Sequence, residues 1–221
     1  ALYFLLPTLL FLTVFVVLPF LYVIYLAFCT FDPFLGTTMW IGLENFRELF
    51  DGGRPIFWKS AINTLYYIVG TVPTRMVIAL SLAVLVNRSM KGVAFVRASF
   101  YLPSIVSTVA ISFVWLWMYD PVSGFFNGIL QALGLSAQPW LTSPDTSMLS
   151  IIIMALWRNV GYCMVLFLAG LQGIPSHLYE AATIDGAEGW QKFRYVTLPL
   201  LKPTSLFVFY VSTLSAFRIF E

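Results

Sequence analysis

Residues 173–203, GIPSHLYEAATIDGAEGWQKFRYVTLPLLKP, form a polar island between two long apolar runs. Ser176 predicts a helix start, because its hydroxyl is placed to cap free backbone N–H groups. Gly186 predicts the end of that helix, since glycine accepts the left-handed backbone of a C-terminal cap. A second helix follows and ends at Leu198-Pro199, and its apolar positions at helical spacing are Trp190, Phe193, Val196 and Leu200. The stretch is too long and too well delimited for a solvated connecting loop, so we predict a helix–turn–helix in water.

The rest of the chain has the composition of a membrane protein. Apolar residues make up 60% and charged residues 10% of the 221 residues, and the mean hydropathy is +0.87. A soluble domain carries about 25% charged residues. The net charge of +2 and the lack of a basic run argue against a nucleic-acid partner. The two cysteines and the single histidine have no metal-ligand spacing, so we expect neither a metal site nor a disulfide framework.

Five apolar segments are candidates for membrane-spanning helices, which need about 20 residues. They are residues 1–28, 61–86, 98–119, 148–172 and 203–221, the last being cut by the end of the sequence. A cleaved signal peptide is the alternative for the first segment, but the run is too long and no small-residue cleavage site follows it. Because the chain starts without Met, we expect further residues before Ala1.

Two connecting segments are expected to hold short amphipathic helices. IGLENFRELF, residues 41–50, has apolar residues on one side, which are Leu43, Phe46, Leu49 and Phe50. GFFNGILQALGL, residues 124–135, is expected to lie on the membrane surface.

The charges of the connecting segments predict the orientation in the membrane. The loop at residues 87–97 carries Arg88, Lys91 and Arg97 without an acidic residue, which is the strongest positive-inside signal of the chain. Since spans alternate in direction, loops 87–97 and 173–203 are predicted to be cytoplasmic, and loops 29–59 and 120–147 extracytoplasmic. The cytoplasmic loops then hold six Lys or Arg residues against three in the outer loops.

The polar stretch also resembles a known motif. EAATIDGA, residues 180–187, followed by WQKFRYVTLPLL, residues 190–201, is similar to the EAA loop of carbohydrate-importing ABC permeases. In that family the loop is a cytoplasmic coupling helix that sits in a groove of an ATP-hydrolysing subunit. The resemblance implies that residues 176–200 contact the ATP-binding subunits and that the coupling element consists of Glu180, Ala181, Ala182, Asp185 and Gly186. Thr183 and Glu188-Gly189 depart from the usual motif.

The resemblance extends over nearly the whole chain. Further segments typical of these sugar permeases are GLENF (42–46), FVRASFYLPSIVSTVAISFVWLWMYDP (95–121), FNGIL (126–130) and LFLAGLQGIP (166–175). They imply an all-α membrane protein with the fold of a type I ABC importer transmembrane domain, in which five spans are visible and a sixth is expected beyond Glu221. Residues 1–60 are then the first transmembrane helix and an extracellular loop, and residues 61–221 the permease core, truncated in the fifth span.

Transport against a gradient needs an energy source, and the chain offers none of its own. No Asp or Glu lies within the first four predicted spans, which argues against proton or sodium coupling. The phosphate-binding sequence GxxxxGK[ST] is absent as well. We therefore expect a non-catalytic transport subunit without cofactors, driven by partner ATPase subunits that hold ATP and Mg.

Polar side chains within the fourth and fifth spans are the candidates for a solute path, and they are Arg158, Asn159, Tyr162, Ser212 and Ser215. The resemblance implies that these two helices line the sugar site, with Tyr162 and Ser212 at binding positions. Tyrosine can stack on a sugar face, and arginine can make directed bonds to hydroxyls or a phosphate. In the competing interpretation the serines only pack helices and Arg158 snorkels outward. Two further intramembrane arginines, Arg75 and Arg218, have no face assigned by the sequence.

These observations predict the permease subunit of a binding-protein-dependent ABC importer that moves a sugar or related polyol by alternating access. The resemblance implies ATP-binding subunits, an extracellular solute-binding protein and a second, similar permease subunit in a heterodimer, all at a bacterial inner membrane. An importer of the same architecture for a polyamine or a phosphorylated polyol is the first alternative. A membrane-embedded enzyme would need clustered reactive residues, which we do not find. A structural membrane scaffold would differ from an importer in lacking solute-dependent ATPase stimulation.

Overall fold

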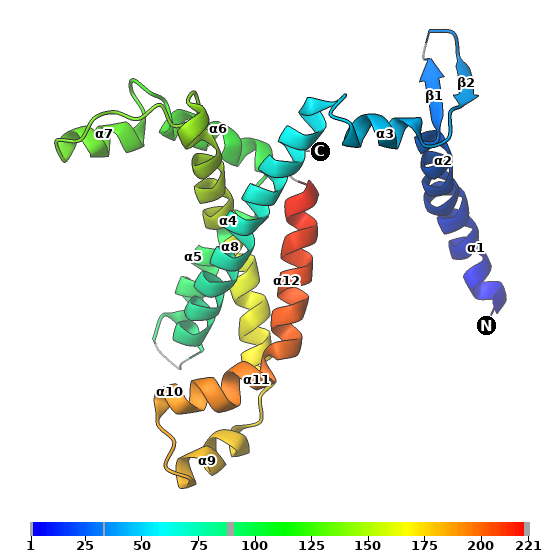
Figure 1. Ribbon diagram of the computed structural model, residues 1–221. Helices are drawn as coiled ribbons and strands as arrows, with labels where there is room; N and C mark the ends of the chain where they lie inside the picture. The colour runs from blue at the N-terminus through cyan, green and yellow to red at the C-terminus, as the bar shows by residue number, and fades with distance from the viewer. Residues whose placement is uncertain (1, 33, 88–90, 219–221) are drawn as a thin grey trace. The chain divides into compact units, whose positions relative to one another are not determined.

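The computed structural model describes residues 2–32, 34–87 and 91–218 of the chain (Figure 1). The expected mainly helical architecture is confirmed. The chain divides into two units, Ala1–Ile62 and Asn63–Glu221. Three helices are long and apolar enough to cross a membrane, and two bent helix pairs raise the number of candidate spans in the described residues to five.

The first unit begins with one long apolar helix, which confirms the first predicted span. It consists of α1 (Leu2–Leu12), the π-helical turn η1 (Thr13–Val17) and α2 (Leu18–Ala27). The backbone N–H of Leu18 donates to the carbonyl of Thr13, five residues back. Pro19 follows directly and has no N–H to offer. The wider π-helical turn therefore lets the helix continue through a proline that would otherwise break it.

A β-hairpin that the sequence analysis did not predict follows this helix. Strand β1 (Cys29–Asp32) pairs antiparallel with β2 (Thr37–Trp40), and Cys29 lies opposite Trp40. The Asp32 carboxylate accepts hydrogen bonds from the backbone N–H groups of Phe34 and Leu35, at 2.8 and 3.2 Å, and so stabilises the turn. The predicted amphipathic helix after the hairpin is confirmed as α3 (Glu44–Phe50).

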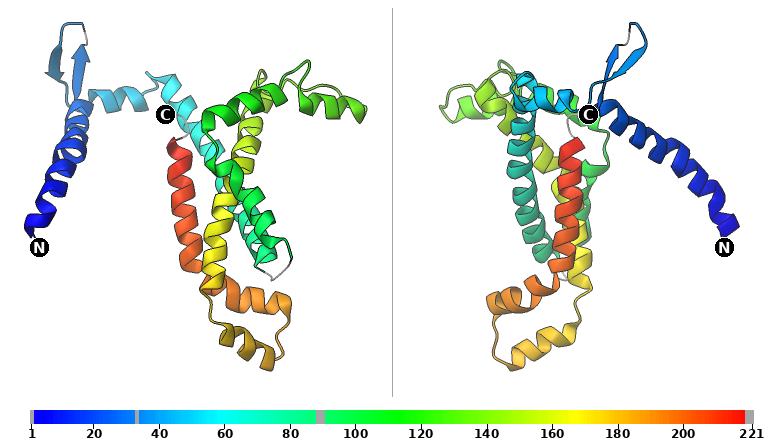
Figure 2. Two further views of the ribbon diagram at one scale, coloured as in Figure 1. Left: turned by 180° about the vertical axis from the view of Figure 1, so that it is seen from behind. Right: turned by 45° about the vertical axis from the view of Figure 1, so that its right-hand side comes forward.

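Most of the second unit is a helical bundle (Figure 1, Figure 2). Its long members are α4 (Pro55–Val86), which starts in the first unit, α5 (Val93–Ile105), α8 (Pro144–Gln172) and α12 (Lys202–Phe217). The core between α4, α8 and α12 combines small residues such as Ala79 and Ala83 with larger ones such as Met164, Phe167 and Val208. A β-carbon at Gly161 of α8 would collide with the backbone carbonyl of Phe100 in α5. Glycine therefore permits a very close approach of these two helices.

Two of the predicted spans begin earlier than expected, each at a proline. α4 starts at Pro55 and α8 at Pro144, where a missing N–H costs nothing because the first turn has no intrahelical acceptor for it. The Ser143 hydroxyl additionally accepts a hydrogen bond from the backbone N–H of Asp145 at 3.3 Å.

The third predicted span, residues 98–119, consists of two helices joined at a sharp bend. α5 ends at Ile105, and α6 (Thr108–Met118) departs from it at an angle of 98°. Val106 and Ser107 between them have extended backbones. Pro103 removes one helical hydrogen bond just before the break, and the Ser104 hydroxyl donates to the Tyr101 carbonyl at 2.6 Å instead of leaving it to the helix. Apolar composition continues across this break and so concealed it.

The polar connections lie at opposite ends of the second unit. α6 and α7 (Phe125–Ala132) lie at one end, and α9 (Ser176–Ile184) and α10 (Gly189–Lys192) at the other (Figure 1, Figure 2). α7 confirms the helix predicted within residues 124–135. Asn87, at the end of α4, lines a small pocket together with Gly189 and Lys192. The loop with the positive-inside signal therefore begins beside the stretch that contains the EAA motif, while Arg88 lies outside the described residues.

Two details of residues 173–203 differ from the prediction. Ser176 is the first residue inside α9, and Pro175 occupies the N-cap position, so the Ser176 hydroxyl does not cap the helix. Leu198-Pro199 does not end the second helix, because the π-helical turn η2 (Phe193–Thr197) carries it into α11 (Leu198–Leu200). As in η1, the residue just before the proline makes a hydrogen bond to a carbonyl five residues back. Here the backbone N–H of Leu198 donates to the carbonyl of Phe193. The helix bends by 64° only after Leu200, before α12 starts.

Candidate solute cavity and coupling segment

The end of α9 is built as the sequence predicts. Gly186 has a left-handed backbone with φ of +78°, and no atom lies within 4 Å of where a β-carbon would stand. The N–H of Ala187 donates to the Ala182 carbonyl at 2.8 Å, and that of Gly186 donates to the Thr183 carbonyl at 3.0 Å. This pair of bonds satisfies the last carbonyls of the helix and turns the chain sharply. Glycine is required here for its backbone and not for space.

The predicted coupling residues form an exposed surface on α9 and its C-terminal turn. Glu180, Ala181, Asp185 and Gly186 are exposed, and Ala182 is half-buried. Ile184 projects beside them with 87% of its surface exposed. A large apolar side chain with carboxylates around it is a suitable contact for another protein. That these residues bind an ATPase subunit stays a prediction.

Two contacts that the sequence analysis missed stabilise the coupling segment, which we define as α9, α10, η2 and α11. The Tyr179 hydroxyl lies 3.0 Å from the hydroxyl of Thr197, which is almost fully buried in η2. Glu188 and Gln191 form a capping box at the start of α10, with the Glu188 N–H donating to Gln191 Oε1 at 2.8 Å. The Glu188-x-x-Gln191 spacing was the available signal for the capping box, whereas nothing in the sequence links Tyr179 to Thr197.

A cavity of about 1020 Å³ lies among α4, α6, α8 and α12. Its polar lining residues include Arg75, Thr108, Ser112, Arg158, Asn159 and Ser215. An adjoining cavity of about 140 Å³ shares Arg75, Asn159 and Ser215 with it and is also lined by Tyr162, Cys163 and Ser212. The structure thus brings all five predicted solute-path residues to one pair of adjoining cavities. Whether solute binds them stays a prediction.

The five residues differ in how free they are to meet a solute. The Arg158 Nη2 donates to the Thr108 hydroxyl at 2.7 Å, and Arg158 is only half-buried. Asn159 donates its amide N–H to the Ala155 carbonyl at 2.8 Å within α8. Ser212 is buried with its hydroxyl 3.6 Å from the Cys163 sulfur, which fits a contact between α8 and α12. Tyr162 keeps 40% of its surface exposed.

Two arginines to which the sequence assigned no helix face also line the cavity. Arg75 is only 3% exposed and lines both cavities, although it lies on α4 and not on the two helices expected to form the solute path. Arg218 lines the larger one. Thr108 joins the site because the break after α5 turns α6 across the bundle, an arrangement that a straight third span would not produce.

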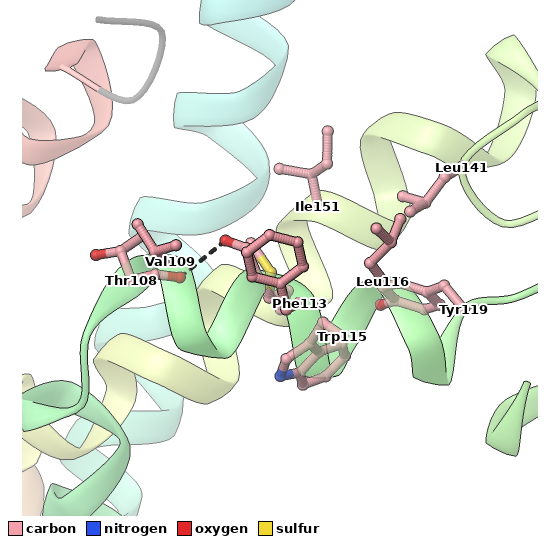
Figure 3. A pocket seen from close by; sticks show the side chains of 10 residues that line it. Thr108, Val109, Phe113, Trp115, Leu116, Tyr119, Leu141 and Ile151 are labelled. Carbon is pink, nitrogen blue, oxygen red and sulfur yellow. Dashed lines mark hydrogen bonds between the residues drawn. The ribbon is translucent and has the colours of Figure 1, made fainter.

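An apolar pocket of about 460 Å³ continues from the larger cavity along α6 (Figure 3). The two share Thr108, Ser112, Ile151 and Met154, and the pocket adds apolar and aromatic residues such as Phe113, Trp115 and Tyr119. The Ser112 hydroxyl donates to the Thr108 carbonyl at 2.9 Å, so its proton is used within the helix. The polar cavity is therefore bordered on one side by aromatic surface.

A bundle of apolar helices around a polar cavity, with an exposed helical segment at one end, has the architecture of a membrane permease. Residues 1–220 match the family described as binding-protein-dependent transport system inner membrane component, and the chain belongs to that family. This finding confirms both the family indicated by the EAA motif and the location in a membrane.

Individual relatives point in the same direction. The chain is 34% identical over 220 residues to a probable ABC transporter permease protein of Pyrococcus horikoshii, covering 99% of this chain and 75% of the relative. It is 34% identical over 216 residues to the trehalose/maltose transport system permease protein of Thermococcus litoralis, covering 98% and 72%. A solved bacterial ABC transporter involved in the import of the acidic polysaccharide alginate matches with a TM-score of 0.81 and 28% identity, covering 95% and 70%. The fold of a type I importer permease is thereby confirmed.

Proposed function

We propose that this permease subunit imports a sugar through alternating access driven by partner ATPases. The observation that carries the proposal is the combination of an exposed EAA segment at one end of the bundle with a polar cavity inside it. The names of relatives support sugar as the solute class, because they include a trehalose/maltose and a lactose transport system permease. The arginines of the cavity oppose the polyamine alternative, since a polycation would meet like charge there.

Energy reaches the cavity through the coupling segment in this proposal. Partner ATPase subunits bind the exposed surface around Glu180 and Asp185, and they hold the ATP and Mg that this chain does not. Movement of α9 passes through the Tyr179–Thr197 contact to η2 and α11 and from there to α12. α12 carries Ser212 and Ser215 in the cavity wall, so its displacement alters the solute path.

The remaining partners follow from the same proposal. A second, similar permease subunit completes the pore, and an extracellular binding protein delivers solute to the end that carries α6 and α7. A solved bacterial alginate ABC transporter with a chain 25% identical to this one is in complex with a periplasmic protein to which an alginate pentasaccharide is bound. The coupling segment and residues 87–97 face the cytoplasm in this arrangement, in accord with their excess of positive charge.

Reconstitution of the whole importer tests the proposal. The permease pair and ATPase subunits are placed in proteoliposomes with the binding protein, and ATP hydrolysis is measured with a panel of neutral and acidic oligosaccharides. The proposal predicts that a sugar stimulates hydrolysis and accumulates in a manner dependent on ATP. Association with an ATPase whose activity no solute changes would instead support the scaffold interpretation.

A further inference from the structure

We propose that the solute carries an oxyanion, either a carboxylate or a phosphate, and that Arg75 and Arg158 bind it in the larger cavity. The inference rests on the proposed import of a sugar and narrows its solute to an anionic saccharide. It is independent of the coupling mechanism, because it concerns only the chemistry of the cavity wall.

Arg75 is the first of the two arginines proposed to bind the oxyanion. Its side chain lies within the membrane-spanning helix α4, is 3% exposed and lines both cavities. Its Nε is buried without a hydrogen-bond partner among the described residues. A buried guanidinium is costly unless its charge and its donors are matched. The neighbours that hydrogen-bond the guanidinium, Tyr67 and Cys163, are not acidic, so its positive charge at the cavity wall would be stabilised by an anionic ligand.

Arg158 provides a second, independent donor on the same cavity. It comes from α8, and its Nη2 is held by the Thr108 hydroxyl at 2.7 Å. Its Nε, like that of Arg75, is buried and has no hydrogen-bond partner within the described structure. The bond to Thr108 holds the Arg158 guanidinium at the cavity wall. Two guanidinium groups from two helices on one cavity wall are suited to a planar or tetrahedral oxyanion.

The described residues supply no counter-charge to this site. The ion pairs found among them are Arg47–Asp51 and Arg54–Glu48, both in the first unit. None of the described residues that line the two cavities is acidic. Since opposite charge is what a desolvated arginine requires, an anionic solute is the group that would complete the site.

The border of the cavity favours a saccharide over a bare inorganic anion. The apolar pocket next to it presents the ring of Phe113 from α6, a residue with 67% of its surface exposed (Figure 3). Sugars expose C–H faces that stack on aromatic rings. A solute with an anionic group at the arginines and a sugar ring toward α6 would use both surfaces.

Binding of defined probes to the purified importer complex tests the inference. The probes are trigalacturonate, its neutral methyl ester, and glucose 6-phosphate as the phosphate counterpart. Wild type is compared with Arg75→Gln, with the charge-retaining Arg75→Lys, and with Arg47→Gln as a control that removes one exposed arginine from the first unit. Melting temperature without probe reports whether each variant folds.

We expect trigalacturonate or glucose 6-phosphate to bind wild type and the Arg47→Gln control, and the methyl ester to bind neither. Arg75→Gln should lower the affinity for the anionic probe about 10- to 100-fold, as expected for loss of a charge-assisted hydrogen bond. Arg75→Lys should recover part of this affinity. The identity of the anionic probe that binds shows whether the site prefers a carboxylate or a phosphate. Equal binding of acid and ester, equal affinity in wild type and Arg75→Gln, or no binding of either anion overturns the inference. Stimulation of ATP hydrolysis by a neutral sugar would overturn it while leaving the proposed function intact.

Discussion

The hydroxyl of Tyr179 in α9 lies 3.0 Å from the hydroxyl of Thr197 in the π-helical turn η2. Thr197 Oγ1 also donates to the Lys192 carbonyl at 3.4 Å, so it accepts the hydrogen bond from the Tyr179 hydroxyl. The contact bridges 18 residues and joins the exposed coupling surface to the helix that continues into α12. Among the described residues it is the side-chain hydrogen bond found between α9 and η2.

Removal of this hydroxyl should loosen the coupling. In Tyr179→Phe the ring stays and one hydrogen bond is lost, which is worth about 1 kcal/mol, or about a fivefold change in an equilibrium. We expect reduced solute-stimulated ATP hydrolysis at an unchanged level of assembled complex. Tyr195→Phe is the matched control, because Tyr195 is 71% exposed on the same segment. Full stimulation in Tyr179→Phe would show that motion does not pass through this contact.

Substitution of Gly161 should separate α5 from α8. Gly161→Ala places a methyl group against the Phe100 carbonyl, and relief of such overpacking costs about 1–3 kcal/mol. Gly128→Ala in α7 is the control, because no atom lies within 4 Å of its added methyl group. Thermal unfolding in detergent should show a lower melting temperature for Gly161→Ala alone. Equal melting temperatures for the two variants would contradict the close helix contact.

Asn127 is expected to hold the connection between α6 and α8 together. It is fully buried, and its amide group donates to the carbonyls of Pro121 and Gln138 and accepts from Gln138 and Trp140, all at 2.9–3.0 Å. Asn127→Ala removes these hydrogen bonds and leaves the half-buried Gln138 and Trp140 without them, at a cost of about 1–3 kcal/mol. Limited proteolysis of this connection should be faster in Asn127→Ala, while Gln131→Ala on the exposed side of α7 serves as control. A proteolysis rate equal to that of the control would refute the role of Asn127.

The turn that precedes α7 should be sensitive to acid. The Asp120 carboxylate accepts from the N–H groups of Ser123 and Val122 and from the Ser123 hydroxyl, and these bonds lower the pKa of Asp120 below its usual value of 3.8. Because the pKa of Asp120 is lower in the folded than in the unfolded chain, the ionised carboxylate stabilises the fold above pH 3.8. This stabilisation is lost as the pH falls through the pKa of the folded state. The difference in melting temperature between wild type and Asp120→Asn should therefore shrink below pH 3.8. A difference that stays constant from pH 7 into this acidic range would argue against the charge of Asp120 as its source.

Much of the fold was accessible from the sequence because hydropathy and charge decide where a helix can cross a bilayer. The start of the chain, α4, α8 and the helix pair around Gly186 follow from those rules. The break at Val106 and Ser107 did not, since both sides of it are equally apolar. The continuation of helices through Pro19 and Pro199 depends on a preceding π-helical turn, and in both places the turn is followed by Leu-Pro.

The site was only partly predictable for a related reason. Residues on one helix, such as Arg158, Asn159 and Tyr162, can be grouped by helical spacing alone. Arg75 and Thr108 meet them only through the packing of α4 and the turn of α6, which no local pattern encodes. The Tyr179–Thr197 contact likewise depends on how two short helices fold back on each other.

Co-purification with the ATPase subunits, followed by assay of their solute-stimulated activity, tests the central claim most directly. The comparison is between wild type and a Glu180→Lys, Gly186→Pro double variant, which reverses a charge on the exposed surface of α9 and blocks its left-handed C-terminal turn. The account predicts that the ATPase co-purifies with wild type and is lost from, or no longer stimulated in, the variant. Equal association and equal stimulation in the two proteins would contradict the assignment of α9 as the coupling helix.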